Sequence, residues 1–256
     1  MLFGILVQRS GKFGMETSTS ILENRRLGIW NVLSDQSFIP LAFSDLDFAI
    51  IDLEHGYRDF SSCQSIVQGL IANQVEVFVR IRNSRDLLIQ SFLDLGVDRF
   101  VVPQVRALEE IEELISKVNF PPNGVRGFHP RYSKLRKGGI HENRVQLFPI
   151  IETREILGFQ QELLKLENVA GFYFGNFDLS MELNCSSDLT DPVILEVLEK
   201  TILNVSNSGK RFIVMPKDQN EISLLSSKRI NDFVIGIDSE ILFNSIQSIK
   251  DSYKGS

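Results

Sequence analysis

The sequence is poor in cysteine and has no long apolar run at its start. Two cysteines occur in 256 residues, Cys63 and Cys185, and they form neither a Cys-x-x-Cys pair nor a metal-ligand spacing. This usage suits a reducing compartment, and we interpret both thiols as small apolar residues. The apolar segment from Met1 to Val7 is too short to span a bilayer and lacks the basic region of a signal peptide. We therefore expect a cytoplasmic protein that does not bind a membrane.

Basic stripes and nucleotide-binding motifs are also missing. The formal net charge is -6, and acidic and basic residues are interspersed along the chain. This balance argues against a nucleic-acid surface and favours a small-molecule or protein partner. No Gly-x-Gly-x-x-Gly or Gly-x-x-x-x-Gly-Lys-Ser/Thr motif follows the first predicted strand. A nucleotide-binding open sheet therefore loses its main sequence support.

Eight apolar, β-rich runs are present, and nearly every one is followed by apolar residues at helical spacing. The composition, 43% hydrophobic and 23% charged, is that of an ordinary globular chain without a break between its halves. We predict strands near Leu27–Leu33, Phe48–Leu53, Val75–Ile81, Arg99–Val105, Leu147–Ile151, Gly171–Phe174, Arg211–Met215 and Asp232–Ile237.

These strands predict a single-domain α/β protein with a (β/α)8 (TIM) barrel. Phe48–Ile51 and Phe100–Val102 are apolar on both faces, as in parallel strands covered by helices. Eight such units and the chain length fit a closed barrel better than the open doubly wound sheet, which is the main alternative. We place the barrel in residues 27–256 and expect residues 1–26 to form an N-terminal arm.

Polar side chains follow several of the predicted strands. Ligands of such barrels bind at the carboxyl ends of the strands, so these side chains are candidates for chemistry. They are Asp52, Glu54, His55, Arg80, Gln104, Glu152, Asp178 and Asp238.

Two carboxylates stand at the ends of consecutive strands and suggest a metal site. Glu152 ends the fifth strand and Asp178 follows the sixth, and neighbouring strands are roughly 5 Å apart. Such oxygen ligands favour Mg²⁺ or Mn²⁺, with Co²⁺ or Zn²⁺ as alternatives. The competing interpretation is that each carboxylate pairs with a basic residue or caps a helix.

Two further features suggest how an anionic substrate is bound. The segment Gly175-Asn176-Phe177-Asp178 leaves a strand at a glycine and offers backbone N–H groups beside the proposed ion. Arg80, at the end of the third strand, carries a guanidinium suited to an oxyanion or a developing enolate. We therefore predict substrate contacts at Arg80, Gly175, Asn176 and Phe177.

In these motifs the chain resembles the HpcH/HpaI aldolase/citrate lyase family, in its metal-dependent pyruvate-aldolase branch. Each motif is weak alone, but their joint order and spacing are specific. They are Asp52-Leu53-Glu54-His55-Gly56, Val79-Arg80 with Leu93-Asp94-Leu95-Gly96, Pro121-Pro122-Asn123-Gly124-Val125-Arg126-Gly127, and Ile151-Glu152-Thr153 with Gly175-Asn176-Phe177-Asp178-Leu179-Ser180.

The resemblance implies a class II aldolase that cleaves or forms a 4-hydroxy-2-oxo acid, giving pyruvate or a close analogue and an aldehyde. By this resemblance Glu152 and Asp178 hold the divalent ion, Arg80 stabilises the enolate, and His55 is the acid/base residue. Asp94 pairs with that histidine across a subunit boundary of a homo-oligomer, for which a hexamer is expected. Asp52 and Glu54 are then supporting residues.

The chain departs from the family pattern at two places. Ile150 stands where many members have glutamine, and Asn176-Phe177 replaces a proline and a small residue. These changes affect the expected substrate more than metal binding. An acyl-CoA lyase of the same family and a barrel without turnover are the alternatives; His55 argues against the first.

Overall fold

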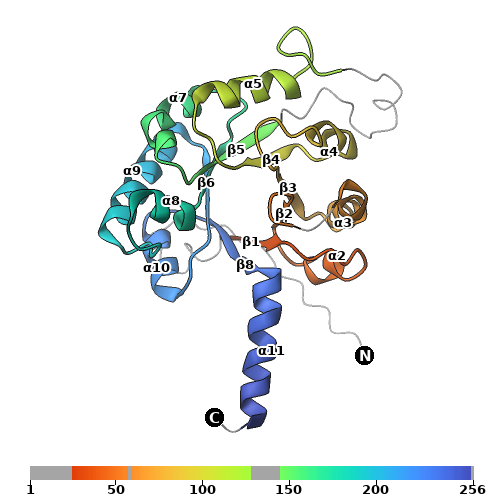
Figure 1. Ribbon diagram of the computed structural model, residues 1–256, viewed down its shortest axis with the longest axis vertical. Helices are drawn as coiled ribbons and strands as arrows, with labels where there is room; N and C mark the ends of the chain where they lie inside the picture. Colours follow the sequence, from red (N-terminus) through yellow and green to blue (C-terminus); the bar gives the residue numbers. More distant parts are fainter. Residues whose placement is uncertain (1–24, 57–58, 128–144, 255–256) are drawn as a thin grey trace, which may run out of the picture.

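A closed barrel of eight parallel strands forms the centre of the molecule (Figure 1). The computed structural model describes residues 25–56, 59–127 and 145–254. Neighbouring strands pair in chain order and β8 closes onto β1, which confirms the predicted (β/α)8 fold. The strands are β1 (Arg26–Asn31), β2 (Phe48–Asp52), β3 (Glu76–Arg80), β4 (Arg99–Val102), β5 (Gln146–Ile151), β6 (Gly171–Phe174), β7 (Arg211–Val214) and β8 (Asp232–Ile237).

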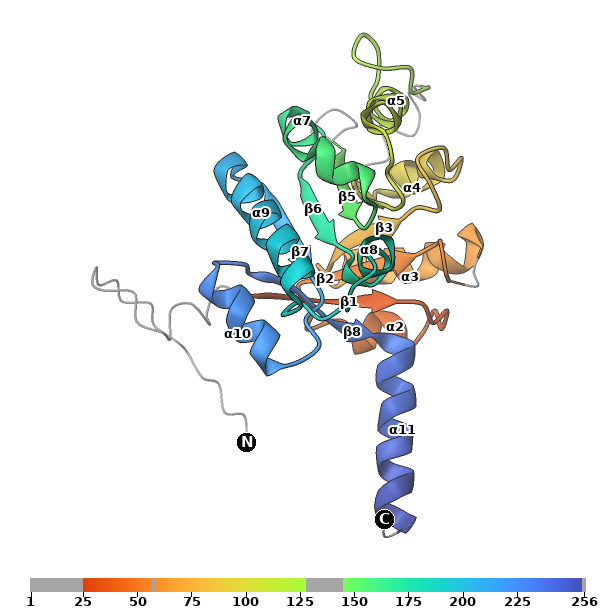
Figure 2. The same cartoon turned by 60° about the vertical axis from the view of Figure 1, so that its left-hand side comes forward.

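Helices surround the barrel on its outside (Figures 1 and 2). Strands and helices alternate along the chain, as expected for βα units. They are α2 (Ile39–Ala42), α3 (Phe60–Ala72), α4 (Ile89–Leu95), α5 (Leu108–Val118), α7 (Gln160–Lys165), α8 (Asn176–Leu183), α9 (Pro192–Ser208), α10 (Gln219–Ser227) and α11 (Asp238–Lys254), with a 3₁₀ turn η1 (Glu155–Gly158).

Side-chain alternation along the strands separates an inner core from an outer one. In β2, Phe48 and Ile50 belong to the cluster inside the barrel, whereas Ala49 and Ile51 pack with the helices. Successive side chains of a strand point to opposite faces. Asp52 is therefore the next inward position, at the carboxyl end of the strand.

The same alternation places the charged ends of β3 and β5. Arg80 follows the inward-facing Phe78, and Glu152 follows the inward-facing Ile150. The apolar residues below them fill the barrel with rings such as Phe78 and Phe148, whose centroids are 5.0 Å apart. Polar groups at the top of this stack face the mouth of the barrel and not its interior.

Ion pairs join the amino-terminal ends of the strands, opposite the polar residues of the mouth. Glu76 forms ion pairs with Arg26 at 2.5 Å, with Arg99 at 2.6 Å and with Arg211 at 3.1 Å. Arg211 also binds Asp232 at 3.0 Å. Because these residues come from five strands, the network ties β1, β3, β4, β7 and β8 together at this end.

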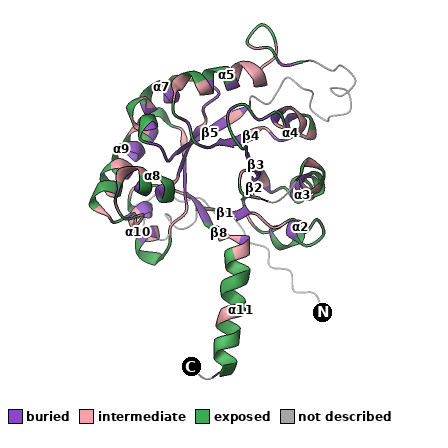
Figure 3. Cartoon of the chain, in the orientation of Figure 1, coloured by how far each residue is buried: buried purple, intermediate pink, exposed green. Residues whose placement is uncertain are grey.

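Helix α11 departs from the barrel pattern. It projects away from the strands (Figures 1 and 2), and its residues are exposed along most of its length (Figure 3). The outer side chains of Leu27 and Ile235, on β1 and β8, are left 40% and 49% exposed. The exposed apolar side chains of α11 are Ile241, Leu242, Phe243, Ile246, Ile249 and Tyr253.

The predicted N-terminal arm, residues 1–26, lies outside the described residues except for Arg25 and Arg26. Arg26 begins β1, and Arg25 donates to Ser226 Oγ at 2.7 Å. Within residues 25–56, 59–127 and 145–254, no helix combines the length and apolarity needed to cross a membrane.

Candidate active site

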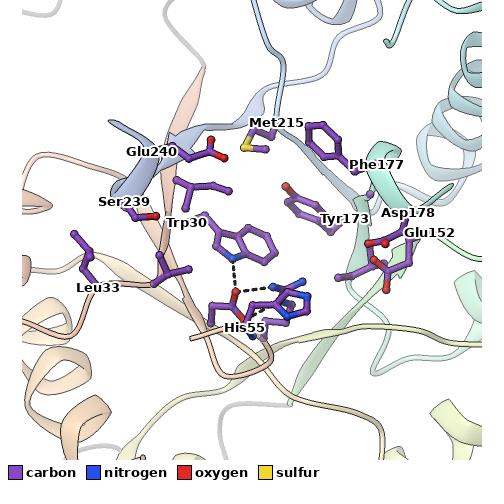
Figure 4. Close-up of a pocket in the computed structure, with 16 residues that line it drawn as sticks. Trp30, Leu33, His55, Glu152, Tyr173, Phe177, Asp178, Met215, Ser239 and Glu240 are labelled. Atoms are coloured by element: carbon purple, nitrogen blue, oxygen red, sulfur yellow. Dashed lines mark hydrogen bonds and ion pairs between the residues drawn. The ribbon is translucent and has the colours of Figure 1, made fainter. Parts of the chain in front are cut away.

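A cavity of about 520 Å³ opens at the carboxyl ends of the strands (Figure 4). Strand ends and the loops that follow them supply its walls, as the barrel fold predicts. Its lining residues are Trp30, Val32, Leu33, Asp52, His55, Arg80, Ile150, Glu152, Tyr173, Gly175, Phe177, Asp178, Met215, Ile237, Ser239 and Glu240.

Asp52 connects several parts of this site. Its carboxylate accepts hydrogen bonds from Arg80 Nε at 2.9 Å, from Arg80 Nη2 at 2.5 Å and from Trp30 Nε1 at 3.0 Å. It also accepts the backbone N–H groups of Glu54 and His55 at 2.9 and 3.2 Å. Burial alone would raise the pKa of Asp52, but the hydrogen bonds and charge of Arg80 outweigh it and lower that pKa.

Arg80 is buried at the cavity wall between two carboxylates and an aromatic ring. Besides Asp52, it contacts Glu54 Oε2 through Nη1 at 3.0 Å. Its guanidinium lies over the Trp30 ring, 4.7 Å from the centroid. Asp52 accepts hydrogen bonds from two of the five N–H groups that an arginine carries, and Nη1 forms an ion pair with Glu54. Arg80 therefore keeps N–H groups with which to bind an oxygen atom in the cavity.

Glu152 is the most strongly perturbed carboxyl group of the cavity. Its Oε1 accepts the backbone N–H of Gln104 at 2.6 Å, and Gln104 adopts the left-handed φ of 51°. Burial, followed by the negative charges of Asp178 and Glu54, raises the pKa of Glu152 to about 7, although the Gln104 hydrogen bond acts in the opposite direction. The charge of Arg80 acts in the opposite direction as well, but it does not outweigh burial and the two carboxylates.

The predicted metal ligands Glu152 and Asp178 lie together at the same wall (Figure 4). Glu152 is buried, and Asp178 is exposed in the first turn of α8. In the described part of the chain, no group of three or more His, Cys, Asp or Glu side chains is arranged to hold a metal ion. Two carboxylates completed by water and substrate oxygens are nevertheless a common arrangement for Mg²⁺. The donor set therefore fits a hard divalent cation.

Gly175 is required by its contact with Glu152. A Cβ atom at Gly175 would lie 2.7 Å from Ile150 Cγ2 and 3.0 Å from Glu152 Cβ. Any side chain here would displace the buried carboxylate. The two predicted substrate contacts that follow differ in position: Phe177 lines the cavity, whereas Asn176 is buried beside it and donates to Ser187 O at 2.6 Å.

His55 and Asp94, the predicted acid/base pair, are not brought together within one chain. His55 is exposed and lines the cavity, where Figure 4 shows it across the opening from Met215. Asp94 lies in α4 and is not among the lining residues; its carboxylate pairs with Arg126 at 3.1 Å. Because the expected pairing crosses a subunit boundary, it stays a prediction.

Several lining residues were not predicted from the sequence. Trp30 and Tyr173 form an edge-to-face pair with centroids 4.9 Å apart, and Met215 and Glu240 lie beyond them (Figure 4). The alternation of β1 and β6 could have revealed the two rings. Asp238, which the sequence marks as a strand-end acid, instead accepts Asn31 Nδ2 at 2.5 Å and anchors the first turn of α11.

Known proteins resemble this chain in sequence over most of its length. The model of the HpcH/HpaI aldolase/citrate lyase family matches residues 26–243. A pyruvate aldolase of Rhizobium etli is 26% identical, and the alignment covers 88% of this chain and 91% of that protein. A 4-hydroxy-2-oxo-heptane-1,7-dioate aldolase of Escherichia coli is 25% identical, with 72% and 74% covered.

Solved structures share the fold. An HpcH/HpaI aldolase from Desulfitobacterium hafniense aligns with a TM-score of 0.79 at 20% identity, covering 91% of this chain and 95% of that one. The citrate lyase beta subunit from M. tuberculosis, complexed with oxaloacetate and magnesium, aligns with a TM-score of 0.58 at 15% identity, covering 85% and 93%.

Proposed function

We propose a catalytic mechanism for this chain, which belongs to the HpcH/HpaI aldolase/citrate lyase family, since the family model matches residues 26–243. It is therefore an aldolase, a lyase that acts on a carbon–carbon bond. Its substrate is a 4-hydroxy-2-oxo acid, which it cleaves to pyruvate or a close analogue and an aldehyde, or forms from them. The observation that carries this proposal is that Glu152, Asp178 and Arg80 line one cavity, where Glu54 pairs with Arg80 at 3.0 Å.

Glu152 and Asp178 would hold a divalent cation, Mg²⁺ or Mn²⁺ by preference and Co²⁺ or Zn²⁺ as alternatives. The support is electrostatic, because burial and neighbouring negative charge raise the pKa of Glu152 to about 7. When bound, such an ion supplies a Lewis acid that polarises the 2-oxo group of the substrate.

Arg80 would stabilise the enolate oxygen. Asp52 fixes the guanidinium through two hydrogen bonds of 2.9 and 2.5 Å, so the group is positioned before substrate arrives. The N–H groups of Arg80 that Asp52 does not bind then donate to the oxygen on which negative charge develops. Lysine could not reproduce this arrangement, since it lacks the fork of parallel N–H groups.

His55 would move the proton at the hydroxyl oxygen on carbon 4. In cleavage the imidazole accepts this proton as the carbon–carbon bond breaks, and in synthesis it returns it. The backbone of His55 is held by its N–H donation to Asp52 at 3.2 Å. Asp94 of a second copy would orient the imidazole, as the family resemblance implies.

The chain would act as a homo-oligomer, for which the resemblance implies a hexamer. The support lies in α11, whose apolar side chains Phe243 and Ile246 are 61% and 53% exposed. Leu27 and Ile235 on the barrel are left uncovered as well. Exposed apolar side chains in this number are typical of an interface, and packing against a second copy would cover them.

Exchange of the methyl protons of pyruvate in deuterated water tests the proposal. We expect exchange with Mg²⁺ or Mn²⁺, followed by proton NMR, because enolate formation is the first step of synthesis. Glu152→Ala should abolish exchange while circular dichroism stays that of the parent, and Glu162→Ala, an exposed change on α7, should leave exchange intact. A folded protein that exchanges with none of Mg²⁺, Mn²⁺ and Co²⁺ would refute the proposal.

A further inference from the structure

We propose that the aldehyde partner of this enzyme carries an uncharged, apolar chain, and that Met215, Phe177 and Glu240 select it. The inference rests on the proposed function, since it concerns the second substrate of the same cavity. In the reaction considered, carbon 3 of pyruvate loses a proton and bonds to the aldehyde carbon. The carbonyl electron pair moves to the aldehyde oxygen, which takes up a proton and becomes the 4-hydroxyl group.

Apart from Glu240, the charged groups of the cavity lie on one side. Arg80 and the carboxylates of Asp52, Glu152 and Asp178 follow β2, β3, β5 and β6, and His55 belongs to the same side. This side holds the groups proposed to bind the 2-oxo acid. Pyruvate therefore occupies it, and the aldehyde chain must extend elsewhere.

The other side of the cavity is mainly apolar, with Ser239 and Glu240 as its polar lining residues. It is formed by residues that follow β7, β8 and β1, with Phe177 from α8 completing the wall. Figure 4 shows Met215 and Phe177 across the cavity from His55, beyond the Trp30 and Tyr173 rings. The apolar lining residues of the whole cavity are Trp30, Val32, Leu33, Ile150, Tyr173, Phe177, Met215 and Ile237, and all but Ile150 and Tyr173 belong to the elements named for this side.

The volume leaves room for a chain on this side. The cavity measures about 520 Å³. At roughly 30 Å³ for each water-sized group, the six non-hydrogen atoms of pyruvate occupy about 200 Å³. The rest, about 320 Å³, can accept an aldehyde of up to about ten carbon and oxygen atoms, with its chain against Met215 and Ile237.

A carboxylate at the far end of the aldehyde would meet no arginine or lysine on the apolar side among the described lining residues. Arg80 is the one arginine or lysine of the described lining; Asp52 and Glu54 bind it, and the proposed mechanism uses its remaining N–H groups for the 2-oxo acid. Lys217 lines the neighbouring cavity instead, and its ammonium group pairs with Asp188. The charge that does face the apolar side is Glu240, and it would repel a second carboxylate.

Two aldehydes of matched shape test this inference. 4-Oxobutanoate ends in a carboxylate, and 4-methylpentanal has an isopropyl group in its place. We expect kcat/KM for addition to pyruvate, with Mg²⁺ present, to favour 4-methylpentanal by about tenfold. Among straight-chain aldehydes from propanal to hexanal, kcat/KM should rise about threefold per methylene group. A preference for 4-oxobutanoate, or no rise with chain length, would overturn the inference.

Variants at Glu240 test the electrostatic part. Glu240 is exposed on α11, so its replacement leaves the fold intact. Glu240→Gln should shift the ratio of the two kcat/KM values toward 4-oxobutanoate by about two- to fivefold, and Glu240→Lys should shift it further. Glu196→Gln, the same change at an exposed position of α9, should leave the ratio unchanged. An unchanged ratio in both Glu240 variants would remove Glu240 from the proposal.

The two proposals fail in different ways. Each ratio is measured within one variant, so changes in the pyruvate half of the reaction cancel. If the parent enzyme exchanges pyruvate protons but prefers 4-oxobutanoate, the substrate class is wrong and the aldolase mechanism stands. If it does not exchange them, the proposed function fails and the substrate class fails with it.

Discussion

The raised pKa of Glu152 predicts an unusual pH dependence of stability in the metal-free protein. Its pKa rises from 4.5 to about 7 on folding, a shift of roughly 2.5 units. Each unit corresponds to 1.36 kcal/mol, so about 3 kcal/mol is involved. The folded state holds this proton more tightly than the unfolded one. Its contribution to stability is fully present below pH 4.5 and is lost as the pH rises through 7.

Urea denaturation in the presence of EDTA measures this contribution. Between pH 5 and pH 8 the parent protein should lose about 2.5 kcal/mol more free energy of unfolding than Glu152→Gln, whose amide does not titrate in this range. Glutamine keeps the oxygen that accepts the Gln104 N–H, so the fold is conserved. Saturating Mg²⁺ at pH 8 should then stabilise the parent and not the variant. Glu162→Gln, exposed on α7, is the matched control.

The reasoning fails if the parent and Glu152→Gln lose stability in parallel between pH 5 and pH 8. Parallel curves would mean that the carboxyl group is already ionised at pH 5 in the folded protein. Burial and the charges of Asp178 and Glu54 would then be balanced without a cation, and the electrostatic argument for a metal site would be lost.

Three further predictions concern other parts of the site and of the fold. Gly175→Ala places a Cβ 3.0 Å from Glu152 Cβ, so it should destabilise the protein by about 1–3 kcal/mol. It should also weaken Mg²⁺ binding in titration calorimetry, and an unaltered Mg²⁺ affinity would contradict this. Arg80→Lys breaks the paired hydrogen bonds to Asp52, so the rate of pyruvate proton exchange measured by NMR should fall at least about 100-fold. A fall in this rate of less than tenfold would show that Arg80 does not stabilise the enolate. Ile246→Glu places a charge on the exposed apolar face of α11, so the mass of the oligomer in analytical ultracentrifugation should be lower than that of Ile246→Val. Equal masses for the two variants would exclude this helix from the subunit interface.

The strands and the positions of Asp52, Arg80 and Glu152 could be predicted from the sequence because both follow from local pattern. Apolar runs mark buried strands, and alternation fixes which side chain faces inward at the strand end. The pairing of Asp52 with Arg80 follows as well, since their strands are neighbours and the two residues are directly paired in register.

Contacts that depend on distant chain segments could not be predicted in this way. Asp238 has the same sequence signature as Glu152, yet its carboxylate is used by the backbone N–H groups of Val32 and Leu33. Helix α11 has the apolar spacing of a covering helix but does not lie on the barrel. The apolar side of the cavity combines residues such as Met215 and Trp30, which only closure of the barrel brings together.

Trp30 is the single tryptophan of the chain, and the fold places it in the cavity wall against Arg80 and Tyr173. The fluorescence of the unlabelled protein, excited at the red edge of indole absorption, therefore comes from the active site alone. A cation beside Glu152, a 2-oxo acid near Arg80 and an alkyl chain near Met215 each alter the field or the polarity around one emitter. Binding of each ligand can thus be followed separately, before any turnover, in a protein that needs no added probe.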